Sequence, residues 1–598
     1  MNPAQQVLSR ASSALLARFS PRTLLEASAG TPLGWFLQVD EVWAIRDAAR
    51  LDRWAPNFYE AALGRLKVSW ECPDHHRDRI PVTGPVVVVA NHPHGLADGL
   101  ILGSMLARVR PDVKFLANPL LAATAPAGVV IPIDPFAGKS AVRSNARGLR
   151  EAVEWLAVGG LLVVFPAGQV ASLDLLARKV REAGWKDTVV RLIRKSGATT
   201  VPLFLEGTNS AAFHLAGLVH PGLRTAMLPR ELVNMRGRRI RVAIGRPISC
   251  SDLAVTDDYK AALAYLEWRS SLLGKTYTAR PAAQGFPKRV RPVAEAGDPS
   301  RIVREMDALP DDQRLGSQAQ YDIWWAKAPQ IPDTLQEVGR LREIAFREAG
   351  EGTGRALDLD RFDQHYRHIL LWDREAGRVV GAYRLAFTSE VLQRFGVDGL
   401  YTNTLFRLKR EFFQVAGPAV ELGRSFIRSE AQKGFLPLLL LWKGLLALIA
   451  QQPEHRVLFG AVSISNLYRR ESRSLMGGYL LRHNLHSKLA RYVDPRGGWR
   501  GLPATYRHGQ CPTSQLDQLS DAVQELEPDG KGLPVLLRQY LNLGGKTVGL
   551  HVDRSFGDVL DALLVVELPL APRRSLDRLM GKVQAEQYLN FKPGCVAA

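Results

Sequence analysis

The stretch PVVVVANHPHGLADG (85–99) decides the fold of the first half of the chain. Its run of valines predicts a buried strand, and Pro93 with Gly95 predicts a loop directly after that strand. The loop delivers His92, His94 and Asp98 together at the strand end. Histidine and aspartate at such a place indicate either a catalytic pair or a metal site.

The sequence after this stretch alternates between apolar strands and helical segments. A helix is expected over 144–159, and the expected strands lie at 129–134, 161–166, 199–206 and 239–249. Such alternation is typical of a layered α/β domain, which we place over 81–274. Residues 1–80 are predicted to be helical and amphipathic, with Trp35 and Trp54. They form either a cap on this domain or a membrane-associating arm.

A second domain of α+β type is predicted over 321–598. The stretch 275–320 is rich in Pro, Gly and charge and reads as a linker. Strands are expected at 368–373 and 378–387, joined as a hairpin, and at 419–427, 455–465 and 561–570. The apolar run 434–450 contains Lys443 and is shorter than the roughly 20 residues that cross a bilayer, so it predicts a buried helix.

The composition limits the class of protein and of partner. A chain of 598 residues is expected to form at least two domains. The net charge of +19 indicates an anionic partner, such as an acidic protein or an anionic membrane surface. No nucleic-acid-binding motif is found, so nucleic acid is not expected. Four well-separated cysteines do not suggest a disulfide framework or a zinc site.

Acyl transfer to a hydroxyl needs a general base and a carboxylate that orients it, which His and Asp can supply. On a helix, His94 and Asp98 would share a face, because they are four residues apart. His92 reaches Asp98 only if the intervening residues form a loop. The HPH motif also opens some metallohydrolase sites, but the later His214 and His220 have no ligand spacing, so no metal is expected.

The first domain resembles the glycerolipid acyltransferase family of the bacterial 1-acylglycerol-3-phosphate type. The resemblance rests on the strand followed by Asn-His and Asp, on IPID, on FPAGQ (165–169) and on VPLFLEG. It implies that His92 is the base and Asp98 its orienting partner, with His94 the alternative base. The chain departs from the family in two ways. Four residues separate histidine and aspartate in the family, whereas five follow His92 and three follow His94 before Asp98, and in the third block Ala167 stands where a glutamate is expected. The missing glutamate suggests an acceptor other than glycerol phosphate.

Further residues of the first domain are expected to bind the acceptor or another anion. Residues before the helix at 144 could form an anion site at its N-terminus or could simply cap the helix. Others belong to the third block or end the strand at 199–206. These candidates are Lys139, Arg143, Asn145, Phe165, Pro166, Gly168, Gln169, Glu206 and Asn209.

The second domain places acidic residues and arginines near strand ends, either as a structural network or as a site for an amine and an anion. The pieces VVGAYRL, ELGRS and LPVLLRQYLNLGGKTVG resemble the GNAT-like N-acyltransferases, in particular the acyl-homoserine-lactone synthase branch and the ornithine N-acyltransferases. The resemblance implies that Glu421 is catalytic. It also implies that the amine and acyl groups are bound by Asp360, Asp363, His368, Arg384 and Arg424.

The two halves together resemble the bifunctional ornithine lipid synthases. The resemblance implies N-acylation of ornithine with a 3-hydroxyacyl group from acyl carrier protein, followed by O-acylation of the new 3-hydroxyl. No cofactor is expected beyond the acyl donor, for which coenzyme A is the alternative. The expected location is the cytoplasmic face of the inner membrane, as a peripheral protein bound to its lipid surface.

Other functions stay open on the sequence alone. They are the same two steps on glycine, lysine or glutamine, a lysophospholipid acyltransferase with an accessory GNAT-like module, and a lipid-binding scaffold without activity.

Overall fold

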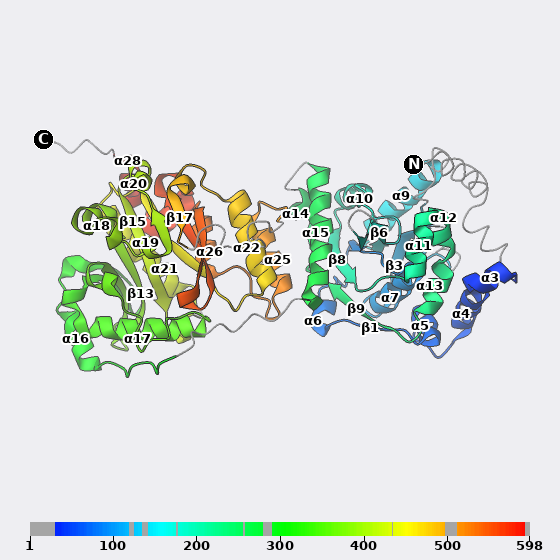
Figure 1. The fold of residues 1–598 in the computed structure, drawn as a ribbon, viewed down its shortest axis with the longest axis horizontal. Helices are drawn as coiled ribbons and strands as arrows, with labels where there is room; N and C mark the ends of the chain where they lie inside the picture. Colours follow the sequence, from blue (N-terminus) through cyan, green and yellow to red (C-terminus); the bar gives the residue numbers. More distant parts are fainter. Residues whose placement is uncertain are drawn as a thin grey trace. The chain divides into compact units, whose positions relative to one another are not determined.

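The structure, a computed structural model, describes residues 30–118, 125–133, 142–174, 178–254, 258–278, 290–432, 434–496 and 511–591. The chain divides into two compact units, Met1–Thr278 (unit 1) and Ala279–Ala598 (unit 2). Each unit contains a large sheet of its own with helices around it (Figure 1).

Unit 1 is built on a seven-stranded sheet in the order β1-β9-β8-β2-β5-β3-β4. Neighbouring strands are parallel except for β8 and β9. The strands are β1 (Ser69–Glu71), β2 (Val86–Ala90), β3 (Val113–Ala117), β4 (Val130–Pro132), β5 (Leu161–Val164), β8 (Thr199–Leu205) and β9 (Arg239–Ile244). Five of them confirm the strands expected from the sequence, and the α/β character of the domain is confirmed with them.

Strand β3 was not predicted, because Lys114 interrupts an otherwise apolar run. In the structure its ammonium lies 3.6 Å from a carboxylate oxygen of Glu151 and 4.4 Å from the ring centre of Trp155. Both partners belong to α9 (Val142–Ala157). The charged end of the lysine is therefore accommodated by a helix that covers the sheet, while its stem stays against the strand.

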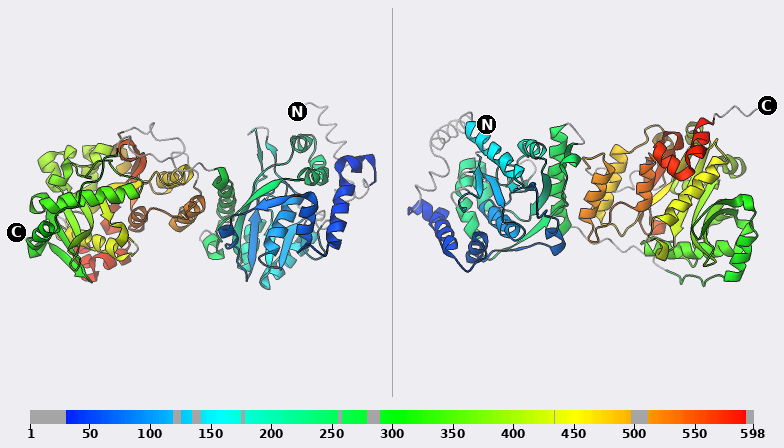
Figure 2. Two further views of the ribbon diagram at one scale, coloured as in Figure 1. Left: turned by 90° about the horizontal axis from the view of Figure 1, so that it is seen from below. Right: turned by 180° about the vertical axis from the view of Figure 1, so that it is seen from behind.

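Helices cover both faces of this sheet (Figure 2). Along β2, Val86 and Val88 belong to a core shared with the helices of one layer, whereas Val87 and Val89 alternate to the other face. The first layer contains α4 (Val39–Leu51), α5 (Phe58–Leu66), α7 (Leu96–Ala107) and α13 (Leu228–Asn234). The second contains α9, α10 (Thr188–Ser196) and α15 (Tyr259–Thr278). A sheet covered on both faces explains the unbroken valine run of β2.

The N-terminal part of unit 1 is helical over its described residues, with α3 (Pro32–Leu37) preceding α4 and α5. Val42 and Ile45 of α4 and Leu63 of α5 join the core of the first layer. Trp35 and Trp54 are instead 81% and 97% exposed. This segment therefore packs on the sheet and at the same time presents large apolar side chains to the outside.

The parallel arrangement fixes where the polar loops of unit 1 meet. Strands β5 and β8 flank β2, and both run parallel to it. The segments that follow their carboxyl ends are 91–95, 165–169 and 206–210, which therefore gather at one edge of the sheet. These segments contain most of the candidate residues for O-acyl transfer.

Unit 2 is built on an eight-stranded sheet in the order β10-β11-β12-β13-β15-β16-β19-β18, antiparallel except for β15 and β16. The strands are β10 (Arg314–Gln318), β11 (Tyr321–Lys327), β12 (Arg367–Asp373), β13 (Arg378–Phe387), β15 (Ala419–Ile427), β16 (Val457–Ile464), β18 (Lys546–Asp553) and β19 (Val559–Glu567). The expected hairpin is formed by β12 and β13.

Two helices cover opposite faces of the central strands of unit 2. Leu370 of β12 lies in a core with α17 (Pro332–Glu348), while Ile369 faces Gly444 of α21 (Leu436–Ala450). Trp442 of α21 is fully buried, which confirms the buried helix expected over 434–450. Among the described helices, none combines the length and the hydrophobicity that crossing a bilayer would require.

The stretch expected as a linker is in part folded. Residues 279–289 lie outside the described residues, but α16 (Pro299–Asp307) and β10 fall inside the range 275–320. Ile302 and Met306 of α16 are buried in the same core as α17. The charged residues of α16 had suggested a linker, whereas their helical spacing leaves one apolar face that packs on unit 2.

Strands β15 and β16 form a short parallel ladder of three residue pairs, from Ala419–Val457 to Glu421–Phe459. Just beyond it, a Cβ atom on Gly460 would lie 2.3 Å from the carbonyl oxygen of Leu422. We therefore expect Gly460→Ala to lower the free energy of unfolding of unit 2 by about 3 kcal/mol, measured by urea denaturation of the full chain.

Gly423 on the neighbouring strand is the matched control, since a Cβ there meets no atom within 4 Å. Gly423→Ala should leave the unfolding midpoint close to that of the wild type. Equal stability of the two variants would contradict the close approach of the strands at Gly460.

Candidate active sites

The loop between β2 and α7 brings His92 onto the carboxylate of Asp98. Helix α7 begins at Leu96, and Gly95 before it has a φ of 77°, in the left-handed region. His92 Nδ1 lies 2.9 Å from Asp98 Oδ2, and the same oxygen accepts hydrogen bonds from the backbone N–H groups of His94 and Gly95. Because Nδ1 donates to the carboxylate, Nε2 of His92 is the nitrogen left to accept a proton.

The side chain of His94 points elsewhere. Its Nε2 donates a hydrogen bond of 3.0 Å to the carbonyl oxygen of Glu206, and the residue is 1% exposed. A Cβ on Gly207 would lie 2.6 Å from this ring, so the glycine makes room for it. His94 thus ties the loop after β2 to the end of β8. Over the described residues, no group of three or more His, Cys, Asp or Glu side chains could hold a metal ion.

Two residues fix the position of His92: Phe165, which the sequence predicted as an acceptor-binding residue, and Glu182, which the sequence did not connect with the site. The ring of Phe165 stacks on the imidazole, with centroids 4.1 Å apart and planes inclined by 23°. The carboxylate of Glu182 accepts hydrogen bonds from the backbone N–H of His92 and from Trp185 Nε1. Burial raises the pKa of Glu182. Glu182 follows the short hairpin of β6 (Ser172–Asp174) and β7 (Lys179–Arg181), so no local pattern linked it to His92.

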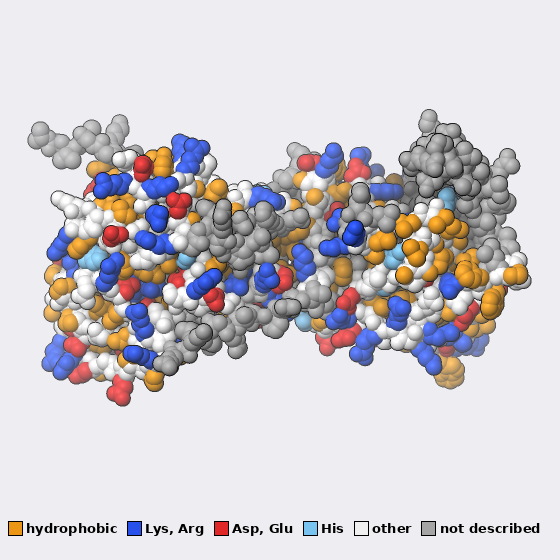
Figure 3. Space-filling model, in the orientation of Figure 1, with side chains coloured by type: hydrophobic (Ala, Val, Ile, Leu, Met, Phe, Trp, Pro, Cys, Tyr) orange, Lys and Arg blue, Asp and Glu red, His pale blue; other side chains and the backbone are white. Residues whose placement is uncertain are grey.

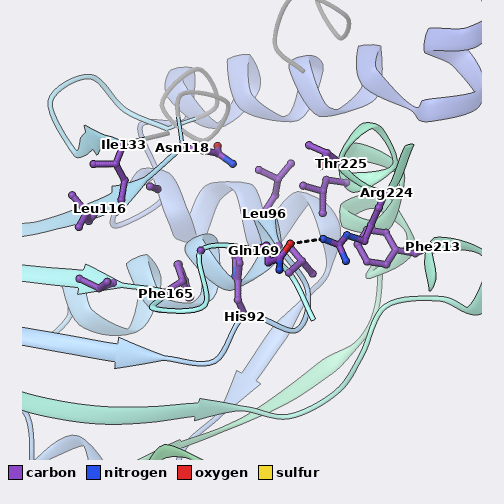
Figure 4. A pocket seen from close by; sticks show the side chains of 16 residues that line it. His92, Leu96, Leu116, Asn118, Ile133, Phe165, Gln169, Phe213, Arg224 and Thr225 are labelled. Atoms are coloured by element: carbon purple, nitrogen blue, oxygen red, sulfur yellow. Dashed lines mark hydrogen bonds between the residues drawn. The ribbon is translucent and has the colours of Figure 1, made fainter. Parts of the chain in front are cut away.

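A cavity of about 840 Å³, its open mouth included, lies in front of His92 (Figure 4). The candidates Phe165, Gly168 and Gln169 line it, and Gln169 points toward Arg224. Arg224 comes from α12 (Pro221–Ala226) and was not predicted. The remaining walls are mostly apolar, formed by Leu96, Leu116, Ile133, Val164, Val170, Phe213 and Leu228. Such a lining suits an acyl chain close to a base.

Other predicted residues of unit 1 lie outside this lining. The carboxylate of Glu206 is paired with the Arg241 guanidinium, with 2.6 Å between Oε1 and Nη2. Asn209 is buried, and Pro166 accepts a hydrogen bond from the Lys186 N–H through its carbonyl oxygen. Asn145 lies in the first turns of α9. Lys139 and the side chain of Arg143 fall outside the described residues.

Unit 2 contains a buried network of ion pairs that joins most of the predicted amine-binding and acyl-binding residues. Arg384 Nη1 lies 2.7 Å from Asp360 Oδ1 and 3.1 Å from Asp363 Oδ1. Arg342 Nη2 extends the network at 3.0 Å from Asp363 Oδ1. Burial alone would raise the pKa of Asp363, but Arg342 and Arg384 hold it well below its usual range.

A second part of this network ends at Arg424. Its Nε lies 3.3 Å from Asp358 Oδ2, which is also 3.8 Å from Arg342 Nε. Arg424 has a φ of 55° at a bulge between β13 and β15, an uncommon conformation for a residue other than glycine. His368 is buried and donates a hydrogen bond of 2.9 Å to the carbonyl oxygen of Asp363. Arg342 and Asp358 were missed, because nothing in their local sequence marks them.

Glu421 lies in the interior, at the parallel ladder of β15 and β16. It is 1% exposed, and its carboxylate accepts hydrogen bonds from the Tyr366 hydroxyl and from the backbone N–H of Thr402. Burial raises the pKa of Glu421. Both oxygens are thus engaged by neighbours, and Glu421 is not among the residues that line a cavity of unit 2.

That cavity measures about 1730 Å³ with its open mouth and lies where β15 and β16 no longer pair. Of the predicted residues, Arg424 lines it, whereas Asp360, Asp363, His368 and Arg384 do not. Three carboxylates that were not predicted also line it: Glu351, Asp553 and Asp561. They come from the segment after α17, from the end of β18 and from the start of β19.

The electrostatics of these carboxylates are set by burial and by their mutual proximity. Burial, with the neighbouring charge of Asp553, raises the pKa of Asp561 to about 7. Burial and the charge of Asp561 raise the pKa of Glu351 to about 8. Asp561 Oδ1 accepts a hydrogen bond of 2.8 Å from the Ser463 hydroxyl. Like charges held together in a cavity would be stabilised by a bound cation.

Comparison with known proteins matches each unit to an acyltransferase. Residues 55–279 match a family model described as "Acyltransferase", and residues 341–442 match one described as "Acetyltransferase (GNAT) domain". A glycine N(alpha)-acyltransferase of Bacteroides thetaiotaomicron is 30% identical over 274 residues, which cover 43% of this chain and 81% of that protein.

Two further proteins resemble parts of the chain. A lyso-glycine lipid O-acyltransferase of Phocaeicola vulgatus is 29% identical over 182 residues, covering 29% of this chain and 62% of that protein. The solved 1-acyl-sn-glycerophosphate acyltransferase of Thermotoga maritima is 18% identical with a TM-score of 0.24, covering 41% of this chain and 93% of its own.

These findings confirm the fold class and the enzyme class predicted from the sequence. An acyltransferase domain of the glycerolipid type forms the N-terminal part, and a GNAT domain lies in the C-terminal part. The relatives comprise both an N-acyltransferase and a lipid O-acyltransferase. The chain therefore belongs to the acyltransferase family that includes the glycine N(alpha)-acyltransferases, and it combines an N-acyltransferase module with a lipid O-acyltransferase module.

Proposed function

We propose that the chain makes a diacylated amino-acid lipid from ornithine in two steps. Unit 2 transfers a 3-hydroxyacyl group from acyl carrier protein to the α-amine of ornithine. Unit 1 then transfers a second acyl group to the 3-hydroxyl of that product. The order follows from the chemistry, because the hydroxyl that unit 1 acylates enters the molecule only with the first acyl chain.

The choice of ornithine is supported by the three carboxylates in the unit 2 cavity. Ornithine carries two ammonium groups and one carboxylate, whereas glycine carries one ammonium group. Glu351, Asp553 and Asp561 offer three acceptors for cations in one cavity, and Arg424 offers a counter-charge for the carboxylate. A dibasic amino acid fits this set better than glycine does, and lysine would share the chemistry.

The second candidate is the same pair of reactions on glycine. It is favoured by the names of the relatives, a glycine N(alpha)-acyltransferase and a lyso-glycine lipid O-acyltransferase. The acid cluster of the cavity would then have one ammonium group to bind.

For O-acyl transfer we assign the role of general base to His92. Its Nε2 removes the proton of the 3-hydroxyl as the oxygen attacks the thioester carbonyl, and Asp98 stabilises the imidazolium that forms. The imidazolium then returns the proton to the leaving thiolate, so the products are an ester and a free thiol. Ala167 fits this acceptor, because an uncharged residue stands at the place where the related glycerolipid enzymes carry a glutamate.

The acyl donor and the location are part of the proposal. The charge of +19 suits acyl carrier protein, which is acidic, and an anionic lipid surface on the cytoplasmic face. Helix α11 (Ala211–Val219) and α12 expose Leu215, Leu218, Val219 and Leu223, from 41% to 78%. Figure 3 shows hydrophobic side chains gathered over these helices. They adjoin the cavity in front of His92, so the lipid acceptor could enter from the membrane.

Lipid mass spectrometry of a bacterial host without amino-acid lipids, expressing the full chain, tests the proposal. We expect a mono-acylated and a diacylated ornithine lipid, both absent from the host with empty vector. Glycine lipids in their place would support the second candidate. New lysophospholipid products without any N-acyl amino acid would overturn both.

A further inference from the structure

Arg224 lies in the wall of the same unit 1 cavity as His92, and the catalytic pair does not use it. Arg224 is 8% exposed, yet its guanidinium lines the cavity and is directed at Gln169 (Figure 4). Its Nη2 donates a hydrogen bond of 2.9 Å to Gln169 Oε1. Among the ion pairs of the described residues none involves Arg224, although a buried arginine normally has a carboxylate or another anion beside it.

The surroundings of Arg224 hold it in place without neutralising its charge. Its aliphatic stem packs over Gly217, where a Cβ would lie 3.2 Å from the Arg224 Cδ. Glu231 of the adjoining helix α13 has other partners, because its carboxylate accepts hydrogen bonds from the N–H and the hydroxyl of Ser210. Burial lowers the pKa of Arg224, which a bound anion would reverse. The guanidinium is therefore fixed in position, charged and open toward the cavity.

We propose that Arg224, held by Gln169, binds the carboxylate of the amino-acid lipid that unit 1 acylates. This inference rests on the proposed function. In an N-(3-hydroxyacyl) amino acid, the carboxylate carbon and the 3-hydroxyl oxygen are separated by about six bonds. Arg224 and His92 line the same cavity, so a single acceptor can place its carboxylate at the first and its hydroxyl at the second. Arg224 would thus be a specificity residue that positions the hydroxyl at the base.

An arginine could also bind the phosphate of the carrier protein's phosphopantetheine arm, and the experiment separates these two anions. O-acyl transfer is measured with the purified full chain, acyl carrier protein as donor and two acceptors, lyso-ornithine lipid and its carboxamide. For the wild type we expect the carboxamide to have a KM about 100-fold higher, because the buried charge is left without its partner.

Arg224→Gln should raise the KM of the carboxylate acceptor about 100-fold, with little change in kcat, and should leave the carboxamide nearly unaffected. Arg224→Lys should recover part of the loss. A rise in the KM of the acyl carrier protein, equal with both acceptors, would assign the arginine to the donor phosphate and overturn the inference. An unchanged KM for every substrate would overturn it as well.

Controls distinguish the loss of carboxylate binding from a folding defect and from a wrong proposed function. O-acyl transfer to the carboxamide by Arg224→Gln reports whether unit 1 is still folded, and N-acylation by the same variant reports on unit 2. Arg236→Gln, which removes an arginine whose side chain is 50% exposed, should leave every KM unchanged. If the wild type does not acylate lyso-ornithine lipid at all, the proposed function fails and the inference falls with it. If the wild type acylates it but accepts the carboxamide equally well, only the inference fails.

Discussion

His92→Ala is expected to lower the rate of O-acyl transfer by about 10³-fold, because general-base catalysis contributes an effect of this size. The same variant should keep N-acylation, so a host that expresses it accumulates the mono-acylated lipid and lacks the diacylated one. Initial rates of the purified variant with lyso-ornithine lipid and acyl carrier protein give the magnitude, and lipid mass spectrometry gives the product pattern.

His94→Ala is the matched control, since it removes the second histidine of the same loop. The contact of His94 with Asp98 is made by its backbone N–H, which alanine keeps. The variant loses the hydrogen bond to the carbonyl oxygen of Glu206 and should therefore lose part of its stability and retain a measurable rate. A rate abolished by His94→Ala and preserved by His92→Ala would overturn the assignment of the base.

Asp561→Asn is expected to lower kcat/KM of N-acylation with ornithine by about 30-fold, as the loss of a charged hydrogen bond predicts. With glycine as acceptor the same variant should change little, because glycine has no second ammonium group to lose. Initial rates with both amino acids give the ratio. Glu375→Gln, on the exposed turn between β12 and β13, is the control for a change of charge alone.

The pH dependence of kcat/KM for N-acylation provides a second test with Asp561→Asn. The pKa of Asp561 is about 7 and that of Glu351 about 8, so both become charged as the pH rises through this range. For the wild type, kcat/KM with ornithine should rise between pH 6 and pH 8. In Asp561→Asn the pKa of Glu351 should fall, because the charge of Asp561 is one of the causes that raise it. The rise should therefore shift to lower pH. Equal losses for ornithine and glycine, with an unshifted profile, would contradict a role in binding the second amine.

The sequence was sufficient to predict those helices and strands whose pattern of residues is local. The valine run of β2, the hairpin of β12 and β13 and the buried helix α21 follow from periodicity and turn residues alone. The loop of His92 could be expected from Pro93 and Gly95. The contact between His92 and Asp98 depends on the backbone conformation at Gly95, which the number of residues between them does not predict.

The site residues that the sequence did not predict come from segments that are far apart in the chain and that the fold brings together. Glu182 meets His92 across 90 residues, and Asp553 and Asp561 come from a different part of unit 2 than Glu351. Arg224 lies on a short helix without a motif. Strand β3 was not predicted because Lys114 carries a charge. In the structure Glu151 of α9 pairs with this charge, a contact that the local sequence does not show. Glu421, by contrast, was predicted from the motif ELGRS. Its carboxylate accepts hydrogen bonds from Tyr366 and Thr402, and the residue does not line the cavity.

The loop between β2 and α7 has a consequence for how such enzymes are found. Helix α7 begins at Leu96, after both histidines. The segment between His92 and Asp98 is therefore mostly loop, and its length is not fixed by helical turns. One residue more or less can be accommodated there while the imidazole and the carboxylate keep their contact. A search that demands a fixed number of residues between histidine and aspartate would overlook chains of this kind, whereas one that demands a strand, a glycine-containing loop and a helix-borne aspartate would retain them.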